Sequence, residues 1–85
     1  MEYVIRTPAQ LGPILKSRRQ QRCLTQSSAA SRVGLKQTTV SAVESDALRT
    51  SVGTLYKLLS ALDLELVLRD KHAEPAKQRS SKREW

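Results

Sequence analysis

The sequence predicts one small, mainly all-α domain of four to five short helices, followed by one β-strand and a disordered basic tail. Helix-capping residues precede several runs of apolar residues at helical spacing, and leucines occupy every second position over residues 62–68. Residues 71–85 contain Pro75 among charged side chains and show no apolar periodicity. Because 85 residues are too few for a second folded domain, we assign the domain to residues 1–70 and the tail to residues 71–85.

The first helix has two candidate starts. Thr7 can serve as its N-cap, with Pro8 in the first helical position and Gln10 reaching back as in a capping box. Pro13 would disturb a helix already under way, because it lacks an N–H group, so the start can instead move to Gly12. The apolar residues of this stretch that recur at helical spacing are Leu11, Ile14 and Leu15.

Two short helices are expected next. Thr25 is a good N-cap for the second helix, and Gly34 suits the left-handed position that ends a helix. The apolar face of this second helix consists of Ala29, Ala30 and Val33. The third helix is expected over about residues 37–45, with Val40 and Val43 pointing inward. Its outward residues would then be Lys36, Gln37, Thr38, Ser41 and Ala42.

A fourth helix and a strand complete the predicted domain. Thr50 or Ser51 caps this helix, whose apolar stripe is expected at Val52, Leu55, Leu59 and Leu62. The alternation that follows, with Leu64, Leu66 and Leu68 on one side, is typical of a strand. A single strand is not stable alone, so it must pair either with residues 3–5 or with a second copy of the chain. We therefore expect a homodimer in which these three leucines lie at the interface.

The composition excludes most catalytic and metal chemistry. Cys23 is the only cysteine and His72 the only histidine, so neither a metal cluster nor a Cys/His nucleophilic pair can be assembled. We expect no enzyme activity and no cofactor. No secretory signal is visible, and no apolar run approaches the length of a membrane span, which favours a cytoplasmic protein without membrane contact.

The charge points to a polyanionic partner. Fifteen lysines and arginines against eight acidic residues leave a net charge of +7. Nucleic acid is a better match for this charge than an anionic membrane surface. Two short helices joined by residues 33–35, the second beginning with small polar side chains, meet the requirements of a helix-turn-helix that reads the major groove.

These landmarks resemble the lambda-repressor/Cro-like (XRE) DNA-binding family over about residues 11–62. The matching segments are Leu24-Thr25-Gln26, Gly34-Leu35-Lys36-Gln37, Val40-Ser41, Val43-Glu44, Thr54-Leu55 and Ala61-Leu62. Thr7-Pro8, the segment from Gly34 to Ser41, the leucine strand and the basic tail ending in Glu84-Trp85 look further like the HipB antitoxins. Three positions depart from that pattern, since Ser28 stands for a usual Glu, Ala29 for a usual Leu and Asp46 for a usual Gly. The first two departures predict a looser second helix, and the third raises a question about the following loop.

The resemblance implies a homodimer that binds palindromic operators in its own promoter and holds a HipA-like Ser/Thr kinase toxin in an inactive complex. Gln26 would contact a phosphate and brace Gln37, and the double-stranded DNA would be contacted by Gln26, Ser27, Lys36, Gln37, Thr38, Thr39 and Ser41. Ala42 would at most contact a thymine methyl group. Glu44 would pair with a basic residue of the domain.

Other basic and aromatic residues have less specific expectations. Four arginines are interpreted as a general electrostatic footprint, namely Arg18, Arg19, Arg22 and Arg32. Trp85 is expected to anchor the kinase partner from the end of the tail. Two alternatives to the antitoxin remain open: a stand-alone transcriptional repressor of the same fold without a toxin, and a helix-turn-helix that contacts only proteins.

Overall fold

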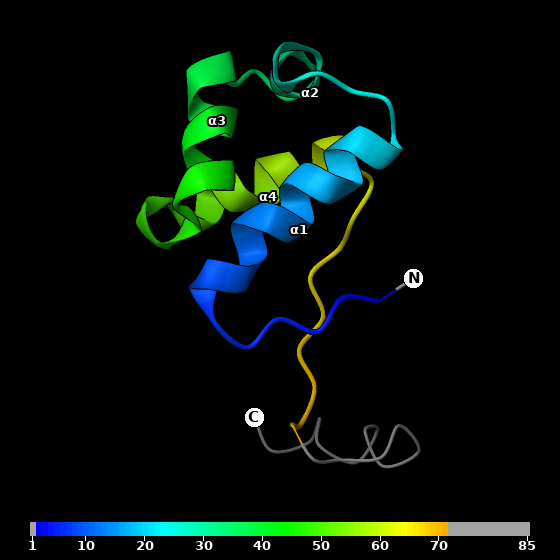
Figure 1. Cartoon of the computed structure of the whole chain (residues 1–85), viewed down its shortest axis with the longest axis vertical. Coiled ribbons are helices and arrows are strands. Elements are labelled where there is room, and N and C mark those ends of the chain that lie inside the picture. Colours follow the sequence, from blue (N-terminus) through cyan, green and yellow to red (C-terminus); the bar gives the residue numbers. More distant parts are fainter. Residues whose placement is uncertain (1, 72–85) are drawn as a thin grey trace.

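Residues 2–71, the part of the chain described by this computed structural model, contain four α-helices and one 3-10 helix (Figure 1). In order they are α1 (Pro8–Gln21), α2 (Gln26–Arg32), α3 (Gln37–Ser45), η1 (Ala47–Arg49) and α4 (Val52–Ala61). The predicted all-α fold is therefore confirmed. Most of the predicted tail, including Trp85, lies outside the described residues. Among the described helices, none has the length and apolar character needed to cross a membrane.

The first helix begins at the earlier of its two predicted starts. Thr7 is the N-cap, and the side-chain oxygen of Gln10 accepts the backbone N–H of Thr7 at 3.1 Å and that of Arg6 at 2.6 Å. Pro13 lies within α1 and is exposed. The helix continues through it because only one backbone donor is missing and the ring faces solvent.

Three of the helices end in the same way. The residue after the C-cap has a left-handed backbone in each case, with φ values of 58° at Cys23, 71° at Gly34 and 62° at Asp63. The next residue is always a leucine whose N–H donates to a carbonyl of the last helical turn, at 2.9 to 3.1 Å. These leucines also pack against the core and are Leu24, Leu35 and Leu64. One local motif therefore both ends each helix and closes the core beneath it.

The core is aliphatic and lies between all of the helices. Its buried side chains are Leu15, Ala29, Ala30, Val40, Val43, Ala47, Leu58, Leu59 and Leu62. The predicted stripe of the fourth helix was wrong at one end, because Val52 is 71% exposed whereas Leu58 is fully buried. Val52 is the first residue of α4 and lies beyond the edge of the core, so the buried face begins one turn later, at Leu55.

The loop after α3 does not need the glycine that the resemblance would place there. Asp46 has φ −153° and ψ 78°, outside the left-handed region, so a side chain is accommodated without strain. Its carboxylate accepts a hydrogen bond from Arg49 Nε at 3.1 Å. The substitution therefore leaves the fold of this loop intact.

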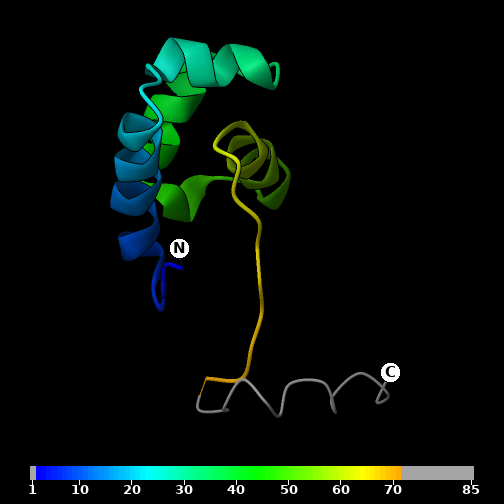
Figure 2. The same ribbon diagram turned by 90° about the vertical axis from the view of Figure 1, so that its right-hand side faces the viewer.

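The predicted strand is not formed by the single chain. Residues 64–70 leave the end of α4 as an extended segment that runs away from the helices (Figure 2), and no described residue, including residues 3–5, pairs with them as a strand. Arg69 and Glu2 form only a side-chain ion pair, at 3.4 Å. A strand requires a backbone partner, and the side chains of Leu66, Val67 and Leu68 are exposed, the last of them 91%. Pairing between two copies stays a prediction.

Gly12 should be the least replaceable glycine, because α1 crosses α3 at this residue. A Cβ at position 12 would overlap the carbonyl oxygen of Glu44, whereas a Cβ at Gly53 in α4 meets nothing within 4 Å. We expect Gly12→Ala to lower the free energy of unfolding by about 1–3 kcal/mol. The matched control Gly53→Ala should raise it by about 0.5–1 kcal/mol. Urea denaturation measures both, and equal effects of the two substitutions would contradict the close helix crossing.

Candidate nucleic-acid interface

Helices α2 and α3 form the predicted helix-turn-helix at one end of the molecule (Figure 1). The left-handed Gly34 and the following leucine turn the chain between them. Thr25 caps α2 through a reciprocal pair, because its hydroxyl accepts the N–H of Ser28 at 3.0 Å while the Ser28 hydroxyl accepts the N–H of Thr25 at 2.9 Å. Serine completes the capping box in place of the longer glutamate, so the departure at Ser28 does not remove the cap of α2. The looser second helix that Ala29 implies stays a prediction.

The predicted DNA-contacting residues differ in how far they reach solvent. Lys36, Gln37 and Thr38 are exposed at the start of α3, and Ser27 is exposed at the start of α2. Gln26, Thr39 and Ser41 are half-buried, so they can offer only part of their polar surface to a partner. Neither α2 nor α3 carries an acidic residue in its first turn. Both helix N-termini are therefore compatible with the approach of phosphate groups.

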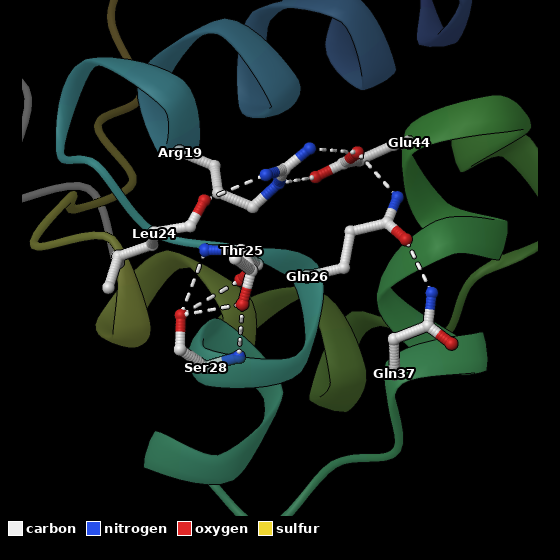
Figure 3. A network of polar contacts seen from close by, with 7 residues as sticks. All are labelled: Arg19, Leu24, Thr25, Gln26, Ser28, Gln37 and Glu44. Carbon is white, nitrogen blue, oxygen red and sulfur yellow. Dashed lines mark hydrogen bonds and ion pairs between the residues drawn. The ribbon is translucent and has the colours of Figure 1, made fainter.

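A chain of polar side chains connects this surface to the interior (Figure 3). Arg19 Nε donates to Glu44 Oε2 at 2.7 Å and Arg19 Nη2 donates to Glu44 Oε1 at 3.2 Å, and both residues are only 8% exposed. Arg19 Nη1 also donates to the carbonyl of Leu24 at 2.8 Å. The expected pairing of Glu44 with a basic residue is thus confirmed.

Gln26 continues this chain to the exposed end of α3. Its Nε2 donates to Glu44 Oε1 at 3.1 Å, and its Oε1 accepts a hydrogen bond from Gln37 Nε2 at 2.5 Å (Figure 3). The predicted brace between Gln26 and Gln37 is confirmed. The contact of Gln26 with a phosphate stays a prediction.

The interpretation of four arginines as a general electrostatic footprint was wrong for Arg19, which is buried in the ion pair. The other three also contact their own chain. Arg18 Nε donates to the carbonyl of Leu62 at 3.3 Å and Arg32 Nη1 to that of Ala61 at 3.5 Å, at the C-terminal end of α4. Arg22 forms a surface ion pair with Asp63 at 3.4 Å. Positive side chains therefore stabilise the carbonyls of Ala61 and Leu62, where α4 ends.

A sequence signal for the burial of Arg19 existed. Gly12, Leu15 and Arg19 follow one another at spacings of three and four residues, and all three are buried on one face of α1. Counting helical positions rather than charges would have placed Arg19 on the core face. Among the described residues there is no group of three or more His, Cys, Asp or Glu side chains that could hold a metal ion.

Comparison with known proteins gives consistent matches. The helix-turn-helix family matches residues 15–68. Two curated relatives named Antitoxin HipB, from two strains of Escherichia coli, are 39% and 38% identical to this chain over 82 residues. The aligned region covers 95% of this chain and 87% and 93% of the two relatives, respectively.

Solved structures of similar proteins also match. A chain described as "Structure of HipA-HipB-O2-O3 complex" has a TM-score of 0.78 and 37% identity, and the match covers 82% of this chain and 99% of that one. A chain described as "HipB-O4 20mer complex" matches with the same TM-score, identity and coverage. Both chains are 37% identical to this chain, so the likeness includes the amino-acid sequence as well as the fold.

Removing one partner of the ion pair between Arg19 and Glu44 should destabilise the fold much more than removing both. We expect Arg19→Met to lower the free energy of unfolding by about 3–5 kcal/mol, because it leaves the buried carboxylate of Glu44 without its charged partner. Combining Arg19→Met with Glu44→Leu should restore most of this loss, since no buried charge then remains. Thermal and urea denaturation measure both variants. A double variant that is no more stable than Arg19→Met would show that the ion pair itself supplies the stability.

Proposed function

Because the chain belongs to the HipB antitoxins, a family of helix-turn-helix proteins, we propose that it represses its own promoter by binding palindromic operators and that it also binds and inhibits a HipA-like Ser/Thr kinase toxin. Proteins of this family bind DNA and are not enzymes, in agreement with the expectation from the sequence. We place the protein in the cytoplasm, and on the nucleoid when it is bound to its operator.

The observation that carries the DNA-binding part is the braced, exposed start of α3. Gln37 projects from the first turn of α3 and is held by Gln26 of α2, so two neighbouring helices fix one side chain at the surface. A helix in this arrangement can lie in the major groove while the helix before it contacts the backbone. We assign base contacts to Gln37, Thr38, Thr39 and Ser41, and phosphate contacts to Gln26, Ser27 and Lys36.

The homodimer is supported by the apolar surface that the single chain leaves uncovered. The exposed apolar side chains of η1, α4 and the extended segment are Leu48, Val52, Tyr56, Leu66, Val67 and Leu68. So much exposed apolar surface on a small domain is typical of an interface. We propose that residues 63–69 of two copies pair as strands, with Leu64, Leu66 and Leu68 at the contact. The two linked helix-turn-helix units would then match the two halves of a palindromic operator.

The kinase partner is supported by the solved complex described with the names HipA and HipB. Trp85 lies outside the described residues, and its proposed role rests on its chemistry. Buried aromatic side chains often dominate the energy of an interface. The predicted tail would let this side chain reach a pocket once the domain has docked.

We expect Gln37 and Lys36 to affect DNA binding in different ways. Gln37→Ala should cost roughly 1–3 kcal/mol per half-site and relax the base preference there. Lys36→Ala should weaken binding to every sequence and flatten the dependence of affinity on salt, because a phosphate contact releases counterions. Fluorescence titrations at several salt concentrations, with the preferred duplex and a scrambled one, test both. Equal losses on both duplexes for Gln37→Ala would show that Gln37 reads no base.

The proposed dimer contact is tested at the extended segment. We expect Leu66→Lys to weaken the dimer and, with it, the affinity for the operator, because a charged side chain replaces an apolar contact. Glu65→Lys is the matched control, since neighbouring residues of a strand point to opposite faces. Sedimentation at micromolar concentration measures the dimer. A monomeric unaltered protein, or equal weakening by the two substitutions, would contradict the proposed contact.

The role of Trp85 is tested by truncation. Removal of Glu84 and Trp85 should leave DNA binding by the dimer nearly unchanged and weaken the complex with the kinase by about 2 kcal/mol or more. Calorimetry of the full-length and truncated proteins against purified kinase measures this difference. Identical affinities would remove Trp85 from the interface, and the absence of any binding would favour a stand-alone repressor.

A further inference from the structure

The four linked side chains lead from a buried charge to an exposed amide. Arg19 and Glu44 are buried, Gln26 is half-buried and Gln37 is exposed (Figure 3). Their hydrogen bonds connect α1, α3 and α2 and then return to the first turn of α3. Among the described residues, no buried side-chain nitrogen or oxygen lacks a hydrogen-bond partner. Every buried polar atom of the network therefore has a partner, and its exposed end at Gln37 keeps free hydrogen-bonding capacity.

The charge of Glu44 fixes which group donates and which accepts in each hydrogen bond of this network. An ionised carboxylate can only accept hydrogen bonds, and the guanidinium of Arg19 beside it can only donate them. The amide of Gln26 must therefore turn its NH₂ group towards Glu44, as observed at 3.1 Å, which leaves its carbonyl oxygen facing Gln37. Gln37 must in turn present its own NH₂ group to that oxygen. The amide orientations follow from the charge of Glu44, since either reversal would bring two oxygen acceptors together.

The consequence is a defined polarity at the exposed end of the network. Gln37 Oε1 points away from Gln26 (Figure 3), and Nε2 keeps one hydrogen after donating the other. Gln37 therefore offers an acceptor together with one donor. Adenine presents the complementary pair in the major groove, with its N6 amine as donor and N7 as acceptor. Guanine O6 and thymine O4 would face the carbonyl oxygen with another acceptor, and cytosine matches only the oxygen.

We propose that Glu44 is a positioning residue that, through Gln26, sets the amide polarity of Gln37 and so makes adenine the preferred base at the position Gln37 contacts. This inference rests on the proposed DNA binding. Glu44 does not touch the DNA, because its carboxylate is buried and its bonds go to Arg19 and Gln26. Its effect is on which base is accepted and not only on how tightly the duplex is bound.

The test uses the full-length protein and a short duplex selected by it from a randomised library. The base pair at which Gln37→Ala loses discrimination identifies the position that Gln37 reads. Dissociation constants for the four base pairs at that position are then measured for the unaltered protein and its variants. We expect the unaltered protein to prefer adenine over guanine there by about tenfold or more.

Two variants remove the constraint on the orientation of the Gln37 amide in different ways. Glu44→Gln introduces a group that can donate to Gln26, so both amides can reverse, and the preference for adenine should fall several-fold at this position alone. Gln26→Met interrupts the chain beyond the ion pair and should give the same loss of preference. Because the bonds between Arg19 and Glu44 remain, Gln26→Met also keeps the test independent of any folding defect in Glu44→Gln. Ser27→Ala is the control, and it should weaken binding to all four base pairs equally.

Each outcome has a defined meaning. Unchanged base ratios in Glu44→Gln and Gln26→Met, even with weaker binding, would show that Glu44 is only structural and would overturn the inference. A preference of the unaltered protein for guanine or thymine, or unaltered discrimination at every position in Gln37→Ala, would also overturn it while leaving DNA binding intact. An unaltered protein that binds selected and scrambled duplexes equally would instead overturn the proposed function, and this inference with it.

Discussion

The buried ion pair between Arg19 and Glu44 is the interaction on which the DNA-facing surface depends. It joins α1 to α3 through residues that are 25 positions apart in the sequence, and it also holds the carbonyl of Leu24 at the entry to α2. A buried charge pair is costly unless all of its hydrogen-bonding groups are satisfied. Here the second oxygen of Glu44 is shared with Gln26, so the arrangement that satisfies the charge also positions the two glutamines at the surface.

Small side chains let this network and the thin core coexist. Gly12 allows α1 to approach the backbone of α3 closely. Ala29 and Ala30 are buried, and their small side chains let α2 pack close to its neighbours. Larger groups at these positions would separate the helices and lengthen the hydrogen bonds between them. The leucines that follow Cys23, Gly34 and Asp63 then close the core at three helix ends. Close approach, rather than bulky packing, thus aligns the polar groups of different helices.

The surfaces of the domain divide by chemistry. The start of α3 is polar and carries Lys36, whereas η1, α4 and the extended segment expose apolar side chains from Leu48 to Leu68. The single chain leaves both surfaces without a partner: apolar side chains face water on one, and the amide of Gln37 keeps free hydrogen-bonding groups on the other. This incompleteness is what a protein needs if it both dimerises and holds DNA, with the net charge of +7 adding attraction to the phosphates.

The sequence by itself determined the helices and their order, because caps such as Thr25 and the left-handed Gly34 act within a few residues. It also placed the exposed start of α3, whereas the brace between Gln26 and Gln37 was implied only by the resemblance to a known family. Only the tertiary structure decided that Arg19 is buried, that Leu58 replaces Val52 in the core and that residues 64–70 form no strand pairing with the other residues that the structure describes. The physical reason is that burial and strand pairing depend on which surfaces of distant segments meet, whereas capping depends only on neighbouring residues.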